Sequence, residues 1–427
     1  METGIRRRRR LGWLAALVLA AALTTAGLGR PARAAEKPIT IGFGMALTGG
    51  LAPNGRAALL AMQLWAKDTN ARGGLLGRPV KLVYYDDQSN PATVPGIYTK
   101  LLDIDHVELV VSDYATNMIA PAMPIVMAHQ MTFLGLLGLD VNAQFHDPDY
   151  FSIAPTGGPD PSSSISQGFF AVAASLTPKP QTIAMVGADA QFSINALKGG
   201  RVLAKQYGFK VVYDRTYPPG TVDYTPIVRA IQATHPDMVL VCSYPPDSVG
   251  MIRAAREVGL NVALFGGAMV GLQATAIKTE LGPLLNGVVD YDFWLPVGGF
   301  ATPEAVDFLK EYQAAVKGKG VDQLGYYLPT FAYSDLQVLA QAVTGTNGLD
   351  QQKLADYMRT HTFHTVVGDI KFGPNGEWVA PRVLEAQFQG VIGHGVEQFT
   401  NPRTEVVLWP DAYKDGSLRF PYVEAQH

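Results

Sequence analysis

The sequence predicts an α/β protein with two lobes, each a mainly parallel sheet flanked by helices. Short, continuously apolar runs alternate with helical segments along most of the chain, a pattern typical of buried parallel strands. A glycine- and proline-rich break at 156–161 divides this series in two. A second break at 291–296 is followed by three successive helices, which fit a return of the chain to the first lobe.

The first lobe opens with a β-α-β unit. Its first strand is expected over Ile39–Ala46, its helix carries an apolar stripe over 59–65, and its second strand covers Val80–Tyr85. Asp86 and Asp87 end that strand, and we expect them to close a turn rather than bind a metal. Ligands of open α/β sheets collect at the carboxyl ends of strands, so the turns that follow these strands are candidate sites.

The same alternation continues through both lobes. Asp113 follows a first-lobe strand and is interpreted as a cap of the adjacent turn, with contact to a ligand as the alternative. In the first lobe we expect a helix at 91–102, a strand at 109–111, a helix from about 117 to 129 and a strand at 132–136. In the second lobe we expect helices at 162–176, 194–207, 224–234 and 247–258, and strands at 182–186, 210–213, 238–241, 263–265 and 287–292. The returning helices are expected at 302–316, 330–343 and 349–360, before a β-rich tail.

The N-terminus is predicted to be a cleaved signal peptide at 1–34, with a non-cleaved membrane anchor as the alternative. A basic run, Arg6–Arg10, precedes the apolar run Leu11–Leu28, and Ala32-Arg33-Ala34 forms a small-x-small cleavage site. Its removal takes away seven arginines and one glutamate, which leaves 27 basic and 36 acidic residues and a net charge of −9. This charge argues against nucleic acid and anionic membrane surfaces as partners.

The residue types that carry catalysis are scattered. The eight histidines show no metal-ligand spacing, and the sequence has neither a nucleophile elbow nor a phosphate-binding loop. The single cysteine, Cys242, lies in an apolar run and is expected to be a small buried hydrophobe. We therefore expect a protein that is not an enzyme, with no cofactor and no metal.

Three segments together point to a known family: LTGGLAPNGRAALLAMQLW, NARGGLLGRPVKLVYYDD and AIQATHPDMVLVCSYPPDSVGMIRAAREVGL. With them the chain resembles, over nearly all its mature length, the periplasmic solute-binding proteins of the branched-chain amino acid ABC-transporter family. The resemblance implies the type I periplasmic-binding fold of leucine-binding-protein-like chains, with a hinge of three crossovers and a ligand held between the lobes. It places the first lobe at 35–156 and 290–366 and the second at 157–289 and 367–427. It also implies a periplasmic monomer whose partners are ABC permease subunits of the inner membrane.

The resemblance further implies a set of ligand-binding residues. Thr116 matches a hydroxyl that, with the backbone amides of its turn, receives the ligand carboxylate; Tyr114 and Ala115 lie beside it. A helix N-terminus and a hydroxyl stabilise an anion, although Thr116 could equally serve only as a helix cap. Other positions that match the cleft of the family are Asn54, Phe192, Tyr244 and Tyr327.

Two family positions are changed here. The acidic residue that pairs with a ligand ammonium falls on Ala268, next to Met269, and a polar position falls among apolar residues that include Leu137 and Leu139. Burying an ammonium without a counter-charge costs several kcal/mol. We therefore expect a small organic acid, aromatic or otherwise largely apolar, as the ligand of an ABC importer. The alternatives are a branched-chain or other amino acid, and a ligand-sensing role for a membrane receptor on the same fold.

Overall fold

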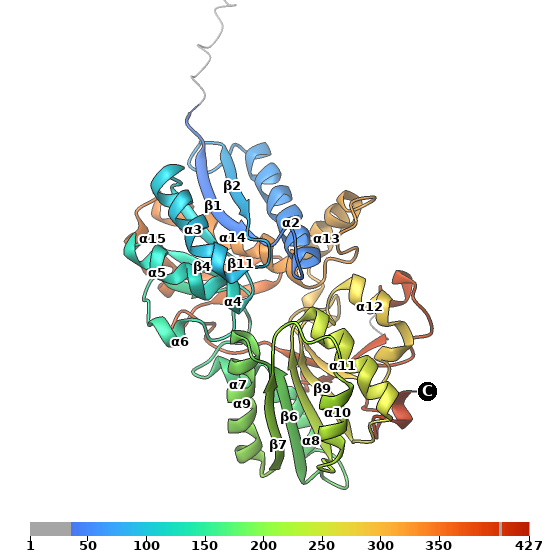
Figure 1. Cartoon of the computed structure of the whole chain (residues 1–427). Helices are drawn as coiled ribbons and strands as arrows, with labels where there is room; N and C mark the ends of the chain where they lie inside the picture. Colours follow the sequence, from blue (N-terminus) through green and yellow to red (C-terminus); the bar gives the residue numbers. More distant parts are fainter. Residues whose placement is uncertain (1–35, 401–403, 427) are drawn as a thin grey trace, which may run out of the picture.

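The computed structural model describes residues 36–400 and 404–426, and it has two lobes (Figure 1). The expected signal peptide lies outside the described residues. The sheet of the first lobe has the order β2-β1-β3-β4-β5, and every pair in it is parallel. Its strands are β1 (Ile39–Met45), β2 (Val80–Asp86), β3 (Leu109–Tyr114), β4 (Phe133–Leu136) and β5 (Tyr150–Ser152).

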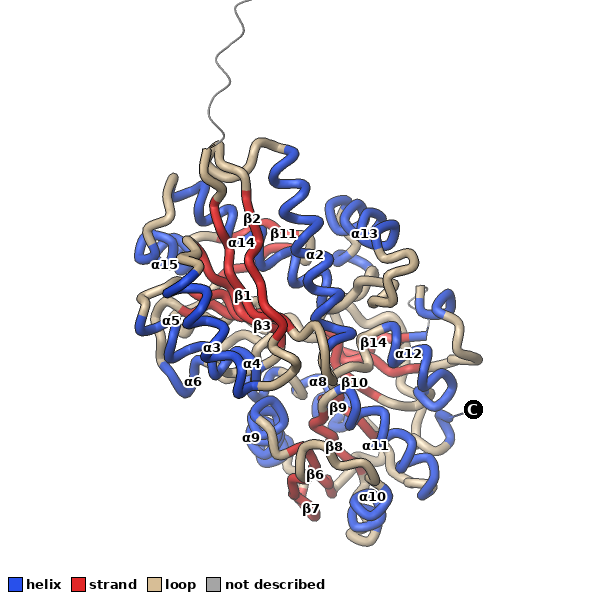
Figure 2. The backbone as a smooth tube through the Cα atoms, turned by 45° about the horizontal axis from the view of Figure 1, so that its top comes forward, coloured by secondary structure: helices blue, strands red, loops and turns tan. Residues whose placement is uncertain are grey.

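Helices cover both faces of this first sheet, as Figure 2 shows. Trp65, which is 1% exposed, belongs to the apolar face of the helix that follows β1, and this face is buried because it packs on the lobe's core. The helices are α2 (Ala52–Ala71), α3 (Val94–Thr99), α4 (Thr116–Ile119), α5 (Met123–Ala128), α6 (Asn142–Phe145), α13 (Pro303–Ala315), α14 (Leu328–Thr346) and α15 (Gln351–Thr360). Because α14 packs along α2, the three late helices belong to the first lobe, as the sequence predicts.

The second lobe holds a seven-stranded sheet of order β14-β13-β10-β9-β8-β6-β7. Five of its strands run parallel, and β13 and β14 add an antiparallel edge. The strands are β6 (Thr182–Ala188), β7 (Lys210–Tyr217), β8 (Met238–Ser243), β9 (Leu264–Met269), β10 (Val289–Asp292), β13 (Leu384–Phe388) and β14 (Glu405–Trp409). The helices are α7 (Pro161–Ser164), α8 (Gln167–Ala174), α9 (Gln191–Tyr207), α10 (Thr225–Gln232), α11 (Pro245–Val258) and α12 (Thr275–Leu281).

Two glycines show how the sequence sets the ends of these helices. Gly208 and Gly259 follow α9 and α11 with φ of 77° and 65°, a left-handed conformation that suits a residue without Cβ. Both are at the positions where the sequence predicts helix ends. The two-lobed, mainly parallel α/β fold predicted from the sequence is confirmed.

The chain passes between the lobes three times. It crosses after β5, again after β10, and a third time between the hairpin β11 (Thr362–Thr365) and β12 (Gly368–Lys371) and strand β13. The first and third crossovers lie side by side: the Arg382 amide donates to the Pro155 carbonyl at 2.7 Å, and the Gly158 amide donates to the Trp378 carbonyl at 2.7 Å. These paired segments form the hinge.

Two expected domain boundaries shift. Strand β10 pairs with β9 and β13, so 290–292 belong to the second lobe rather than the first. The β11–β12 hairpin packs against α14 and α15, so 367–371 remain with the first lobe. Both shifts arise because a crossover begins where strand pairing stops, which the local sequence pattern does not mark.

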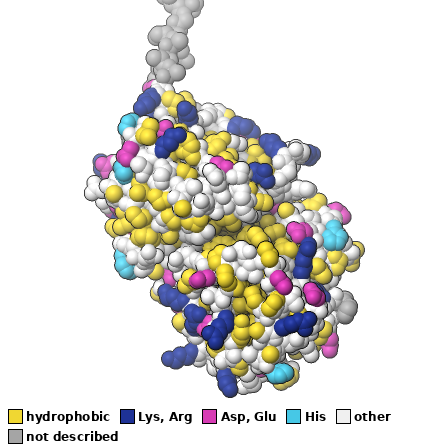
Figure 3. Space-filling model, in the orientation of Figure 1, with side chains coloured by type: hydrophobic (Ala, Val, Ile, Leu, Met, Phe, Trp, Pro, Cys, Tyr) yellow, Lys and Arg dark blue, Asp and Glu magenta, His cyan; other side chains and the backbone are white. Residues whose placement is uncertain are grey.

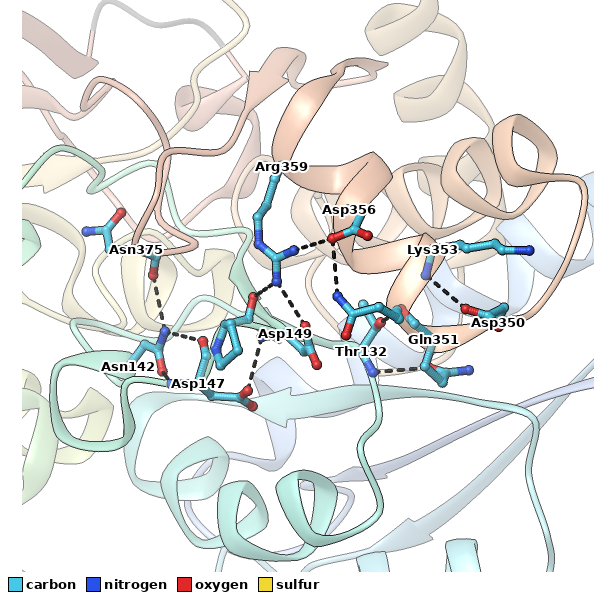
Figure 4. A network of polar contacts seen from close by, with 12 residues as sticks. Thr132, Asn142, Asp147, Asp149, Asp350, Gln351, Lys353, Asp356, Arg359 and Asn375 are labelled. Atoms are coloured by element: carbon cyan, nitrogen blue, oxygen red, sulfur yellow. Dashed lines mark hydrogen bonds and ion pairs between the residues drawn. The ribbon is translucent and has the colours of Figure 1, made fainter.

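A polar network fixes the hinge to the first lobe (Figure 4). Arg359 on α15 donates to the Asp149 carboxylate at 2.9 Å, next to β5. The Asn142 side-chain amide donates to the Asp147 carbonyl at 2.8 Å and to the Asn375 carbonyl at 3.2 Å. The third crossover is therefore held against the loop that precedes β5.

The acidic residues near β2 and β3 take different roles. Asp86 accepts a hydrogen bond from the Gln88 amide and Asp87 accepts one from the Ser89 amide, so both close the turn that follows β2, as expected. Asp86 also accepts from the amides of Leu47 and Thr48 in the turn after β1. Asp113 does not cap a turn: it is fully buried, and its side chain interacts with that of Asp87. The cap interpretation was wrong because the side chain points into the protein rather than along the chain.

The described part of the chain contains neither a membrane-spanning helix nor a cluster of metal-binding side chains. Within it, no helix has both the length and the apolar composition needed to cross a bilayer. The same residues contain no group of three or more histidine, cysteine, aspartate or glutamate side chains arranged to hold a metal ion. Cys242 is fully buried in β8, and burial raises the pKa of its thiol well above the usual range, so it behaves as a small hydrophobe.

Candidate functional site

A cavity lies between the two lobes, where the carboxyl ends of strands from both sheets meet. Its volume is about 20 Å³, room for roughly one water molecule. On the face drawn in Figure 3, hydrophobic side chains gather along the junction of the lobes. The lining residues are Tyr114, Ala115, Thr116, Leu137, Gly138, Leu139, Ala154, Thr156, Ile165, Phe192, Tyr244, Val270, Tyr291, Phe293 and Tyr327.

The turn between β3 and α4 forms one wall of the cavity. Ala115 has φ 87° and ψ 146°, a backbone conformation that non-glycine residues rarely adopt. Because α4 begins at Thr116, its first backbone amides have no partner within the helix. The Thr116 hydroxyl accepts a hydrogen bond from the Leu139 amide at 2.9 Å. Its own proton therefore remains available to donate.

Tyrosine hydroxyls form a second group of polar atoms in the cavity. The Tyr114 hydroxyl accepts from the Asn54 side-chain amide at 3.1 Å, and the hydroxyls of Tyr291 and Tyr327 are 3.3 Å apart. Burial raises the pKa of Tyr114 to about 12, so its phenol is neutral and acts as a donor at physiological pH. Tyr244 accepts from the amide of Phe192 at 3.1 Å, which joins the start of α9 to the start of α11.

The lining carries no charged side chain among the residues that the structure describes. A carboxylate does lie beside the end of β9, that of Asp290. Its two oxygens accept from the Met269 amide at 2.8 Å and from the Gln273 side-chain amide at 3.1 Å, and Asp290 is not part of the lining. Burial also raises its pKa well above the usual range, which favours the neutral acid. The cavity therefore offers neutral hydroxyl and amide groups on apolar walls.

Direct contacts join the two lobes beside the cavity. The Asn195 side-chain amide, on α9, donates to the carbonyl of Leu139 at 2.8 Å. Asp140 accepts from the Ser162 hydroxyl at 2.6 Å and from the Lys198 ammonium at 3.2 Å. These contacts join the lobes next to Leu139, which lines the cavity.

Most of the residues singled out from the sequence meet at this cavity. The structure brings together Tyr114, Ala115, Thr116, Leu137, Leu139, Phe192, Tyr244 and Tyr327. Asn54 lies behind the wall and contacts it through the Tyr114 hydroxyl. Ala268 and Met269 do not line it, because β9 continues through Met269 and the chain turns into the cavity one residue later, at Val270.

Three of the seven lining residues that the sequence reasoning missed lie on the crossovers, namely Ala154, Thr156 and Phe293. Tyr291 and Phe293 belong to the break at 291–296, where an aromatic-rich run at an expected crossover was the available signal. Nothing in the local sequence marks the others, which are Gly138, Ala154, Thr156, Ile165 and Val270.

Comparison with known proteins identifies the family. The family described as periplasmic binding protein matches residues 38–381. The chain is 24% identical over 387 residues to the Leu/Ile/Val-binding protein homolog 8 of Brucella suis, which covers 88% of this chain and 94% of that relative. An ABC transporter substrate-binding protein from Sphaerobacter thermophilus superposes with a TM-score of 0.70 at 21% identity, covering 82% of this chain and 93% of that one. A solute-binding protein from R. palustris in complex with benzoate has a TM-score of 0.71 at 17% identity, covering 87% and 96%. The chain belongs to the periplasmic binding protein family.

Proposed function

We propose that this protein is the extracytoplasmic substrate-binding component of an ABC importer, and that it binds a small, largely apolar organic acid by hinge closure. The observation that carries the proposal is the composition of the cavity, which presents hydroxyl groups but no charged side chain among the described residues. An amino acid would leave its ammonium there without a counter-charge, at a cost of several kcal/mol, or roughly a thousandfold in affinity.

A carboxylate suits the wall near Thr116. It is an acceptor, and charge-assisted hydrogen bonds from hydroxyls and backbone amides are stronger than those between neutral groups. The Thr116 hydroxyl has its oxygen occupied by the Leu139 amide, which leaves its proton for an anion. The aromatic rings of Phe192, Tyr244 and Phe293 provide faces against which a flat or aliphatic body packs.

The amino acid alternative rests on the name of the Brucella suis relative, and the aromatic acid on the benzoate complex of the R. palustris protein. Both share the fold, so the side chains of the cavity must decide. Val270, at which the chain after β9 reaches the cavity, is apolar, and the carboxyl of Asp290 nearby is already hydrogen-bonded within the protein. These side chains favour an organic acid over an amino acid as the ligand.

In this proposal, closure of the two lobes on the ligand produces the form of the protein that takes part in transport. A ligand that contacts both lobes stabilises the closed arrangement by its contacts to each of them. We expect permease subunits of the inner membrane to recognise that arrangement, and the protein to act as a monomer in the periplasm.

A thermal-shift screen of the protein lacking residues 1–34 tests the ligand class. Aromatic and aliphatic carboxylates at millimolar concentration should raise the melting temperature, whereas leucine and glutamate should raise it little, because only the amino acids bring an unpaired ammonium. A larger shift with leucine than with any carboxylate in the panel would refute the ligand class while leaving the transport role intact.

Thr116→Val tests the grip on the carboxylate. Loss of the hydroxyl should weaken binding of the best acid by roughly 1–3 kcal/mol, measured by calorimetry, and Thr116→Ser should restore most of it. Thr132→Val is the matched control, since it also loses a buried threonine hydrogen bond, to the Gln351 carbonyl at 2.6 Å, but lies outside the cavity. Equal affinities in Thr116→Val and the wild type would mean that Thr116 serves the fold alone.

A further inference from the structure

One hydroxyl of the cavity differs from all the others. Among the six hydroxyl groups of the lining, five have a hydrogen-bond partner within the protein: Tyr114, Thr116, Tyr244, Tyr291 and Tyr327. The sixth, Oγ1 of Thr156, is buried and has no partner in the part of the chain that the structure describes. A buried hydroxyl without a partner is costly, and such groups in native proteins are few.

The backbone at this residue is fixed. The Thr156 carbonyl accepts a hydrogen bond from the Ser164 hydroxyl on α7, which ties the first crossover to the second lobe. The residue is 1% exposed, so bulk water does not satisfy its side chain. The lining also includes Ala154 and Ile165, whose apolar side chains offer no hydrogen-bonding group. A molecule inside the cavity is therefore the remaining candidate partner for the hydroxyl.

We propose that Thr156 is a specificity-determining residue that hydrogen-bonds a second polar group of the ligand, a hydroxyl or carbonyl oxygen distant from the carboxylate. The inference rests on the proposed function and narrows it. The turn after β3 holds the carboxylate near Thr116, whereas Thr156 approaches from the first crossover, so the two threonines come from different elements of the cavity wall. The substrate class is then a hydroxy- or oxo-substituted acid, such as a phenolic acid, in preference to the unsubstituted one.

The test measures how much more tightly the protein binds a hydroxybenzoate than benzoate. The dissociation constants of benzoate and of its 2-, 3- and 4-hydroxy derivatives are determined by calorimetry for the wild type, Thr156→Val and Thr156→Ser. The wild type should bind at least one hydroxybenzoate about five- to tenfold more tightly than benzoate, the range of one neutral hydrogen bond. Thr156→Val should bring that ratio to about one, and Thr156→Ser should keep most of it. Thr116→Val is the matched comparison, because it should weaken both acids and preserve the ratio.

The outcomes separate this inference from the proposed function. If benzoate binds but no hydroxybenzoate is preferred, or if Thr156→Val keeps the wild-type ratio, the role of Thr156 is overturned and the organic-acid function stands. If none of the carboxylates binds, both fail. A second readout needs no ligand: Thr156→Val should not lower the melting temperature, since it removes a hydroxyl that has no partner. A fall of several degrees would reveal a partner within the protein and overturn the inference.

Discussion

Replacing Asp113 with asparagine should stabilise the folded protein at pH 8 and change its stability little at pH 4. Asp113 is fully buried in β3, and its carboxyl group interacts with that of Asp87, which is also fully buried. Burial raises the pKa of Asp87 to about 6 and that of Asp113 well above its usual range. An aspartate in the unfolded chain has a pKa near 3.9.

The sign of this pH dependence follows from the numbers of protons that the folded and the unfolded states bind. Between pH 4 and pH 6 the folded state holds protons that the unfolded state has released, so the stability of the fold decreases as the pH rises through this window. A carboxyl whose pKa is about 6 rather than 3.9 costs the fold roughly 3 kcal/mol above pH 6. Because burial also raises the pKa of Asp113 well above its usual range, we expect removal of its ionisable group to increase the free energy of unfolding at pH 8.

Urea denaturation at pH 4, 6 and 8 checks this expectation for the wild type and Asp113→Asn. At pH 4 both carboxyls of the wild type are protonated, and an asparagine amide takes the place of a neutral acid with the same shape. At pH 8 the amide donates to the ionised Asp87 rather than repelling it. A variant that is less stable than the wild type at pH 8, or whose stability differs from it equally at all three pH values, would refute the account of a buried, proton-sharing pair.

Three other substitutions test packing, strain and charge, each by urea denaturation at pH 7. Gly44→Ala should destabilise by about 1–3 kcal/mol, because its Cβ would lie 2.2 Å from an Asp113 oxygen, and adding Asp113→Ala should recover most of the loss. Ala115→Gly should stabilise by about 1 kcal/mol, since glycine adopts φ 87° without strain; a loss of stability would contradict this. Lys278→Met should cost about 3–5 kcal/mol, because it leaves the Glu405 carboxylate buried without the ammonium that now lies 2.6 Å away. The double variant with Glu405→Leu should be close to the wild type, and an equal loss in both would argue against a charge effect.

The sequence was sufficient for features that depend on local periodicity. The alternation of apolar runs and helical stripes predicts both sheets, and the turn after the strand at 109–111 predicts where Thr116 lies. The positions of Phe192 and Tyr244 were predicted from the resemblance to the family. These positions meet because parallel strands end at a common edge of their sheet. A strand end is known from sequence only to within a residue or two, which explains why Val270 rather than Ala268 reaches the cavity.

Local sequence patterns could not predict which residues of the crossovers reach the cavity. They have no periodic pattern, and their residues reach the cavity only because the lobes are folded against each other. Thr156 and Phe293 line the cavity from such segments, although they lie far apart in the sequence. The interpretation of Asp113 was wrong for a related reason, since a polar residue at a strand end is more often a cap than half of a buried carboxyl pair.

The contacts between the lobes bear on how selective closure can be. Asn195 and Asp140 join the lobes by hydrogen bonds to main-chain and side-chain groups that a ligand does not need to touch. Each such bond contributes about 0.5–1.5 kcal/mol, and the exposed Lys198 adds less. These contacts favour closure whatever the cavity contains, so they supply no discrimination between ligands. Discrimination has to come from groups whose satisfaction depends on the ligand, and in this cavity those include the Thr116 proton and the unpartnered Thr156 hydroxyl.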